Sequence, residues 1–327
     1  ACIVSVMEAE GMSPDPDDLI VTSGGQQAID LIAKTLVDPG DPVICEAPTY
    51  PGAVPTFCSY EADVIQITTD DDGMRIDELS EVLARLAREG RRPKFIYSVP
   101  SFQNPAGVTL SAERRRRLVE LAREHEVLVC EDNPYGLLRY DGEPQPTLYS
   151  LDGGDYVIYL GTLSKILSPG IRIGWVVAPP PVLEKIGLGK QAADLCTSTL
   201  TQYFVREYFA EGRWRAYIDD LIEIYRGRRD VMLVGHSMGG LVARVALAGA
   251  QRIRRIVQIG APNGGSFAPV LALRAVYPTV RKLAALDLRH SAEDLARIVF
   301  RTLPSLHELL PLPQGTQPDL FDAAQWP

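Results

Sequence analysis

One lysine of this chain stands in a context that suits covalent chemistry. Lys165 follows an apolar stretch at residues 156–160, which is typical of a buried strand, and two hydroxyl residues, Thr162 and Ser164, precede it closely. Arg172 comes seven residues later. A lysine amine can form an imine with an aldehyde, and hydroxyl and guanidinium groups can hold a phosphate dianion. The spacing indicates a site for a phosphate-bearing aldehyde cofactor, although lysine and serine are also common where strands end.

An acid and an amide follow two other apolar stretches. Asp132 comes shortly after residues 127–130, where its carboxylate could pair with a pyridinium nitrogen and keep the ring able to accept electrons. Asn104 follows a stretch that ends near residue 98, and it could donate to a ring oxygen. Both residues could instead belong to ordinary turns, because Asp and Asn-Pro pairs are frequent there.

Two further segments could complete such a site. Residues 23–26, Ser-Gly-Gly-Gln, open a predicted helix after a predicted strand. The free backbone N–H groups at a helix start bind phosphate well. Tyr50 lies between two prolines and could stack on a flat ring.

A second kind of chemistry is indicated near residue 237. Residues 231–240 read as a strand, the pattern Gly-His-Ser-Met-Gly and the start of a helix, which is the arrangement of a nucleophile elbow around Ser237. A working triad also needs an acid and a histidine downstream and an oxyanion donor upstream. Only His290 and His307 follow Ser237, and a packed or surface histidine is the expected role of His307.

The elements that must position these groups alternate along the chain. Apolar stretches of strand length alternate with helix-period segments from about residue 18 to residue 177. This alternation predicts an α/β fold with a mostly parallel, doubly wound sheet. Ser111 is expected to cap a helix over residues 111–126, and a long helical region is expected from about residue 182 to residue 229. After residue 229 the pattern restarts with strands at 231–234 and 253–259.

Taken in order, the motifs over about residues 3–232 resemble the large domain of the class I and II, fold-type-I aminotransferases. The resemblance implies pyridoxal 5'-phosphate as cofactor, an α-amino acid and a 2-oxo acid as substrates, and a homodimer. It implies that Lys165 forms the internal aldimine and then moves a proton, that Asp132 pairs with the ring nitrogen, and that Tyr50 stacks on the ring. The implied partners of the ring hydroxyl are Asn104 and Tyr135, and those of the phosphate are Gly25, Gln26, Thr162, Ser164 and Arg172.

Residues 231–327 resemble a different family, the lipase-like and lecithin–cholesterol acyltransferase-like α/β-hydrolases. The early strands of that fold are missing upstream of residue 231, so hydrolase activity through Ser237 is not expected. The small domain of an aminotransferase, with the arginine that binds the substrate α-carboxylate, is replaced by this segment. We therefore expect two parts, residues 1–230 and 231–327, joined without a linker in a chimeric or misassembled chain.

Three alternatives to an active aminotransferase stay open at this point. The chain could be a non-catalytic pyridoxal-phosphate-binding module, as in the sensor domains of MocR regulators. It could be a serine hydrolase or acyltransferase, or an inactive chimera that folds only in part.

Composition limits the binding partners, the metal and disulfide sites and the cellular location that this protein is expected to have. The 327 residues carry a net charge of −9, which disfavours a nucleic-acid or acidic-membrane partner. The five cysteines form no CxxC pair, so neither a metal site nor a disulfide framework is expected. No apolar run reaches membrane-span length, and a reducing cytoplasm is the expected location.

Overall fold

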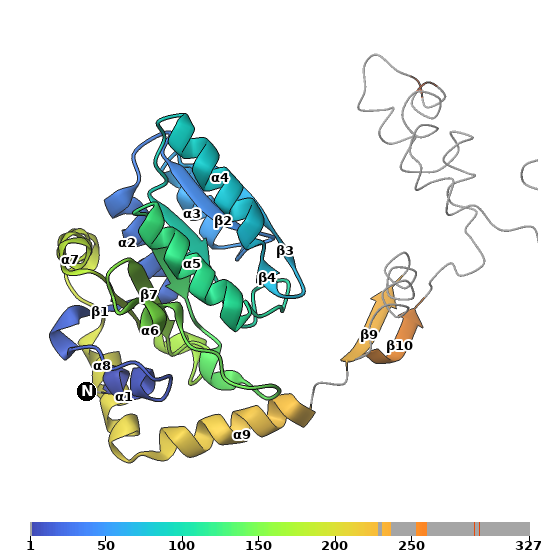
Figure 1. Ribbon diagram of the computed structural model, residues 1–327. Coiled ribbons are helices and arrows are strands. Elements are labelled where there is room, and N and C mark those ends of the chain that lie inside the picture. The colour runs from blue at the N-terminus through green and yellow to red at the C-terminus, as the bar shows by residue number, and fades with distance from the viewer. Residues whose placement is uncertain (1, 228–230, 237–252, 260–290, 292–293, 295–327) are drawn as a thin grey trace, which may run out of the picture. The chain divides into compact units, whose positions relative to one another are not determined.

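The computed structural model describes residues 2–227, 231–236, 253–259, 291 and 294 (Figure 1). The chain divides into two compact units, residues 1–226 and 227–327. Within the second unit, β9 (Val231–His236) and β10 (Ile253–Ile259) form a parallel pair, at the two positions where the sequence predicts strands.

The first unit is built on one eight-stranded sheet with the order β1-β8-β7-β6-β5-β2-β3-β4. Neighbouring strands from β7 to β3 are parallel, whereas β8 is antiparallel to both β1 and β7, and β4 is antiparallel to β3. The mostly parallel sheet that the sequence predicts is thus confirmed. The strands are β1 (Leu19–Thr22), β2 (Pro42–Ala47), β3 (Asp63–Asp70), β4 (Gly73–Met74), β5 (Phe95–Ser98), β6 (Leu128–Asp132), β7 (Val157–Thr162) and β8 (Gly174–Val177).

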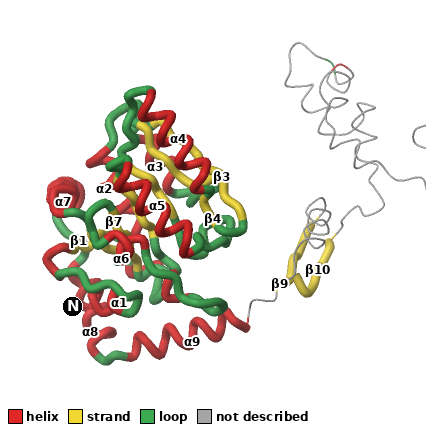
Figure 2. The backbone as a smooth tube through the Cα atoms, in the orientation of Figure 1, coloured by secondary structure: helices red, strands yellow, loops and turns green. Residues whose placement is uncertain are grey.

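Helices cover both faces of this sheet, as the ribbon and the tube show (Figures 1 and 2). One face packs against α2 (Gly25–Leu36), α3 (Ala53–Ser59) and α7 (Pro180–Asp194). The other packs against α4 (Ile76–Arg88), α5 (Ala112–Glu124) and α6 (Leu148–Asp152). Successive strand residues point to opposite faces, so Cys45 belongs to the first core and Ile44 to the second. Burial on both faces explains why the strands read as continuous apolar runs.

A third apolar cluster lies at the β1–β8–β7 end of the sheet. It includes Trp175 of β8 together with residues of α1 (Cys2–Glu8), α8 (Thr199–Ala210) and α9 (Arg213–Gly227). The chain also makes short 3-10 helices, η1 (Pro16–Asp18), η2 (Gly136–Leu138) and η3 (Pro169–Ile171). Of the helices in the described ranges, none is long and apolar enough to span a bilayer.

The helical region predicted from about residue 182 is confirmed as far as residue 227, but it is not one continuous helix. The structure has three helices there, α7, α8 and α9, because two residues adopt a positive φ that no right-handed helix can accommodate. Leu195 ends α7 with φ 62°, and Gly212 separates α8 from α9 with φ 68°. The predicted helix cap at Ser111 is confirmed, since its side chain accepts a hydrogen bond from the Arg114 N–H.

Candidate active site

The parallel strands bring several loops to one edge of the sheet. β2, β5, β6 and β7 run in the same direction, so their carboxyl ends meet there. β1 ends at the same edge, because it is antiparallel to β8, which is itself antiparallel to β7. The register sets Gly174 between Thr22 of β1 and Thr162 of β7. Ligands of open α/β sheets bind at such an edge.

A cavity of about 190 Å³ opens at this edge. The ten residues that the sequence predicts as cofactor ligands all line it, namely Gly25, Gln26, Tyr50, Asn104, Asp132, Tyr135, Thr162, Ser164, Lys165 and Arg172. They come from six separate segments of the chain, so the fold gathers what the sequence presents as scattered strand-end motifs.

One side of the cavity, the arginine end, consists of Gly25, Thr162, Ser164 and Arg172. The Ser164 N–H donates to Thr162 Oγ1 at 3.2 Å, and the two hydroxyl oxygens lie 2.9 Å apart. Arg172 donates from Nη2 to the Ser23 carbonyl at 3.1 Å. Unpaired N–H groups of the first turn of α2, two hydroxyls and a guanidinium thus face the same space, which is a donor set for an anion.

Two glycines make this close approach possible. A Cβ on Gly24, which has φ 82°, would lie 2.3 Å from Arg172 Nη2. A Cβ on Gly174 would lie 2.7 Å from the Gly24 carbonyl carbon and 2.8 Å from the Gly25 nitrogen. Real Cβ contacts do not reach such distances, so only glycine lets β8 approach the start of α2 and lets Arg172 lie across it.

A second part of the cavity lining, the aspartate end, is built around Asp132 at the end of β6. Asp132 is buried, and it accepts a hydrogen bond of 2.6 Å from the Tyr97 hydroxyl of β5. Burial raises the pKa of Asp132 to about 6, and the Tyr97 hydrogen bond acts in the opposite direction. A positive group beside this carboxyl group would favour its charged form and lower its pKa.

A buried glutamate ties the neighbouring loops together. Glu46 of β2 accepts hydrogen bonds from Ser98 Oγ at 2.6 Å, from the Val99 N–H at 3.2 Å and from Gln103 Nε2 at 3.2 Å. Gln103 Nε2 also lies 2.6 Å from the Pro48 carbonyl. The loop that carries Asn104 is thereby joined to the loop that carries Tyr50.

Lys165 directly follows Ser164 in the sequence and lines the same cavity as the arginine end and the aspartate end. Its Nζ is 5.9 Å from the centroid of the Tyr135 ring. Within the part of the chain that the structure describes, Nζ has no hydrogen bond and no ion pair. Its amine is therefore placed to form an imine with an aldehyde that enters the cavity.

Sequence reasoning missed Tyr97 and Glu46, which support the site from the strands behind it. Tyr97 lies inside an apolar strand, where its hydroxyl is the one signal that a buried polar partner is needed. Glu46 gives a stronger signal, because an acid inside the apolar run of β2 must be paired if it is buried.

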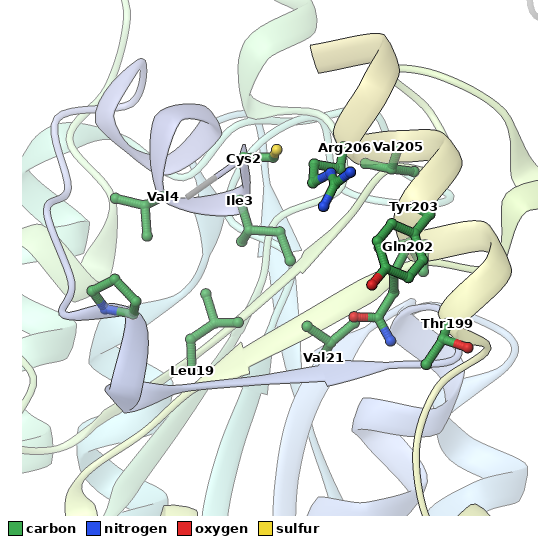
Figure 3. Close-up of a pocket in the computed structure, with 12 residues that line it drawn as sticks. Cys2, Ile3, Val4, Leu19, Val21, Thr199, Gln202, Tyr203, Val205 and Arg206 are labelled. Carbon is green, nitrogen blue, oxygen red and sulfur yellow. The ribbon is translucent and has the colours of Figure 1, made fainter. Parts of the chain in front are cut away.

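A larger cavity of about 470 Å³ lies elsewhere, between α1, β1 and α8 (Figure 3). Its lining is mainly apolar, with Gln202, Tyr203 and Arg206 on the α8 side. It contains none of the ten residues above, so size alone does not identify the site. No group of three or more potential metal ligands occurs among the described residues, and Ser237, His290 and His307 lie outside them.

Comparison with known families decides the identity of the first unit. The model of aminotransferase class I and II matches residues 2–234. The chain belongs to this family. The aromatic-amino-acid aminotransferase 1 of Thermococcus litoralis is 48% identical over 216 residues, which cover 66% of this chain and 52% of the relative.

Solved structures of family members share the fold. The multiple substrate aminotransferase of Thermococcus profundus superposes with a TM-score of 0.65 at 44% identity, covering 71% of this chain and 56% of that one. The α-aminoadipate aminotransferase of Thermus thermophilus, solved with N-(5'-phosphopyridoxyl)-L-leucine, gives a TM-score of 0.66 at 30% identity and covers 84% of this chain and 69% of that one. The chain spans about half the length of the curated relatives it matches.

A different family matches the segment that follows. The model of the PGAP1-like alpha/beta domain matches residues 214–301, so the two matched regions overlap over residues 214–234. The overlap begins in α9 and ends inside β9. The two matched regions therefore share most of α9 and the first part of β9.

Proposed function

We propose that this chain carries the cofactor-binding domain of a pyridoxal-phosphate-dependent aminotransferase, which transfers an amino group from an α-amino acid to a 2-oxo acid. The observation that carries the proposal is the cavity at the strand ends, in which the Lys165 amine shares one space with the donors of the arginine end and with a buried acid. Family membership and the names of the relatives, which include aromatic-amino-acid and aminoadipate aminotransferases, support the same reaction class.

The donor set fits the phosphate of this cofactor. The arginine end offers the N–H groups at the start of α2, the hydroxyls of Thr162 and Ser164, and the Arg172 guanidinium. A phosphate dianion needs several donors and at least one positive charge, and these groups supply both. Gln26 and Gly25 complete this wall of the cavity.

The residues at the other end fit the ring. When bound, the cofactor supplies an aldehyde that condenses with amines and a ring that withdraws electrons from the substrate Cα. Asp132 would hold the proton on the ring nitrogen, Asn104 and Tyr135 would bind the ring hydroxyl, and Tyr50 would stack on the ring face. Lys165 Nζ would carry the cofactor at rest and would then take up and return the proton at the substrate Cα.

We infer that this chain binds the amino-acid substrate less well than it binds the cofactor. The resemblance assigns the arginine that binds the substrate α-carboxylate to a domain that follows the matched region in the family. In this chain, residues 214–301 match a PGAP1-like domain instead. We therefore expect ready cofactor loading and slow transamination.

The test is a visible absorption spectrum of the purified chain with pyridoxal phosphate. A new absorption band that is lost in Lys165→Ala is expected, and Lys185→Ala, which changes an exposed lysine on α7, is the matched control. Absence of a band in the wild-type chain contradicts the proposal. Adding an amino acid to the loaded chain then separates an aminotransferase from a non-catalytic binding module, because the band disappears only where the amino group is transferred.

We further propose that the two parts of the chain have separate origins and join between about residues 226 and 231. The overlap of the two family matches over residues 214–234, which share most of α9 and the first part of β9, supports this, because separate domains are usually joined by a linker that belongs to neither. The lipase-like elbow around Ser237 is part of the same proposal. Sequencing the source DNA across codons 225–240 in independent isolates tests it, and a reproducible uninterrupted join argues against misassembly.

The remaining expectations stay predictions. A homodimer is supported by exposed apolar side chains at the end of α7 and along α8, including Leu195 at 81% and Phe204 at 62% exposure. Analytical ultracentrifugation tests it.

The cytoplasmic location stays a prediction from the cysteine pattern. Loss of fluorophosphonate labelling in Ser237→Ala would revive the serine-hydrolase alternative, which the family match of residues 2–234 does not favour.

A further inference from the structure

An ion pair between a buried lysine and a partly exposed aspartate lies next to the arginine end of the cavity, outside its lining. Lys190 of α7 is only 5% exposed, and its Nζ donates to Asp194 Oδ1 at 2.7 Å and Oδ2 at 3.0 Å. The same Nζ donates to Gln27 Oε1 of α2 at 3.1 Å. A buried lysine is costly unless each of its protons has an acceptor, so this pair needs an explanation beyond surface solubility.

The pair is connected to the start of α2 through one residue, Ser23. Asp194 Oδ2 accepts hydrogen bonds from Ser23 Oγ at 3.1 Å and from Gln27 Nε2 at 2.8 Å. The Ser23 N–H donates to Gln27 Oε1 at 2.8 Å, and its carbonyl accepts from Arg172 Nη2 at 3.1 Å. Every polar group of Ser23 is therefore held, two of them by this network and the third by Arg172.

The charge state of the network is defined. Burial acts to raise the pKa of Asp194, but hydrogen bonds from Lys190 and Gln27 outweigh it and lower the pKa below its ordinary value. Asp194 is thus charged at neutral pH and neutralises Lys190. The positive charge of Lys190 is used inside the network, which leaves Arg172 as the cation that faces the cavity at this end.

We propose that Lys190 and Asp194 are positioning residues for the phosphate of the cofactor. They fix Ser23, and Ser23 in turn fixes both the first N–H groups of α2 and the Arg172 guanidinium. An anion site whose donors are already in place avoids the entropy cost of ordering them on binding. This inference rests on the proposed function, because it assumes that the arginine end binds the phosphate of pyridoxal phosphate.

The test compares two ligands that differ only in the phosphate, pyridoxal phosphate and pyridoxal. In the double variant Lys190→Met/Asp194→Leu, affinity for pyridoxal phosphate is expected to fall about tenfold, whereas affinity for pyridoxal changes less than about twofold. The double variant removes both charges together, so no unpaired charge stays buried. The matched control is Arg85→Ala/Glu89→Ala, which removes an exposed ion pair of the same spacing on α4 and is expected to change neither affinity.

A milder variant keeps the proposal testable if the double variant does not fold. Ser23→Ala removes only the hydroxyl that Asp194 binds, and a loss of about threefold, again confined to the phosphorylated ligand, is expected. Equal weakening of both ligands, or no change in either, overturns the positioning role. Failure of the wild-type chain to bind pyridoxal phosphate contradicts the proposed function instead, so the two failures are distinct.

Discussion

The arginine end and the aspartate end of the cavity offer groups of opposite charge, and the two ends are built from different chemical groups. The arginine end consists mostly of backbone N–H groups and short hydroxyls that glycines bring close together. The aspartate end consists of a buried carboxyl group held by a tyrosine from the neighbouring strand. The first depends on how closely backbone segments from distant parts of the chain approach each other, and the second on a hydrogen bond between side chains of two adjacent strands. A change at the arginine end should therefore act through steric fit or through the loss of a donor, and a change at the aspartate end through protonation.

The largest expected effect is at Gly174. In Gly174→Ala the new Cβ would meet the backbone of Gly24 and Gly25, which cannot move aside as a flexible side chain can. We expect affinity for pyridoxal phosphate to fall about a hundredfold. Overpacking should also lower the free energy of unfolding by about 1–3 kcal/mol. Titration followed by absorbance and chemical denaturation measure the two effects. The control is Gly187→Ala, where the new Cβ makes only an ordinary contact with Ile20.

The next effect is at Arg172. Arg172→Met removes the guanidinium from the arginine end, and a charge-assisted hydrogen bond to an anion contributes about 2 kcal/mol. Affinity for pyridoxal phosphate should fall about thirtyfold, whereas affinity for pyridoxal should hardly change. Titration with both ligands measures the difference. A similar loss for pyridoxal would mean that Arg172 does not bind the phosphate.

At the aspartate end, Asp132→Asn should raise the stability of the chain without cofactor at high pH and weaken cofactor binding. The folded-state pKa of Asp132 is raised from the ordinary value to about 6, so folding favours the protonated acid. The stability that this group contributes at low pH is lost as the pH rises toward 6, and above that pH the buried charge costs about 3 kcal/mol.

Asparagine removes this cost but cannot hold a proton on the ring nitrogen. Without cofactor, the variant should have a higher Tm than the wild type at pH 8 and no such advantage at pH 4. Its affinity for pyridoxal phosphate should be about tenfold weaker. Thermal denaturation at the two pH values checks the first part. A lower Tm at pH 8 would show that the charged carboxylate is stabilising in the chain without cofactor.

The smallest effect is expected at Tyr97. Tyr97→Phe removes the hydrogen bond that lowers the pKa of Asp132, so that pKa should rise further. Cofactor affinity should fall about threefold at neutral pH, and the pH below which binding weakens should move upward from about 6. Titrations from pH 5 to pH 8 measure the shift. An unchanged pH dependence would separate Tyr97 from the protonation of Asp132.

The same contrast explains what could be predicted from the sequence. The predicted cavity residues lie at or after the ends of strands within short motifs, so local pattern was enough to indicate Lys165, Asp132 and Arg172. Tyr97, Glu46 and Lys190 act through partners on other strands or helices, and strand order and register are not visible in one sequence.

The helices show a similar limit. The pattern predicts the alternating α/β fold because burial on both faces leaves continuous apolar strands. It did not predict where the helical region after residue 180 breaks, because Leu195 carries a positive φ that leucine rarely adopts. Glycine is the usual residue at a left-handed position, so Gly212 was a signal that the prediction did not use.

The central claim is that Lys165 carries the cofactor in this cavity. The direct measurement is to load the chain with pyridoxal phosphate, reduce it with borohydride and locate the modified lysine by peptide mass spectrometry. If Lys165 carries the cofactor, a single major adduct on Lys165 is expected. An adduct mainly on another lysine, such as exposed Lys185, or the absence of any stoichiometric adduct would contradict it.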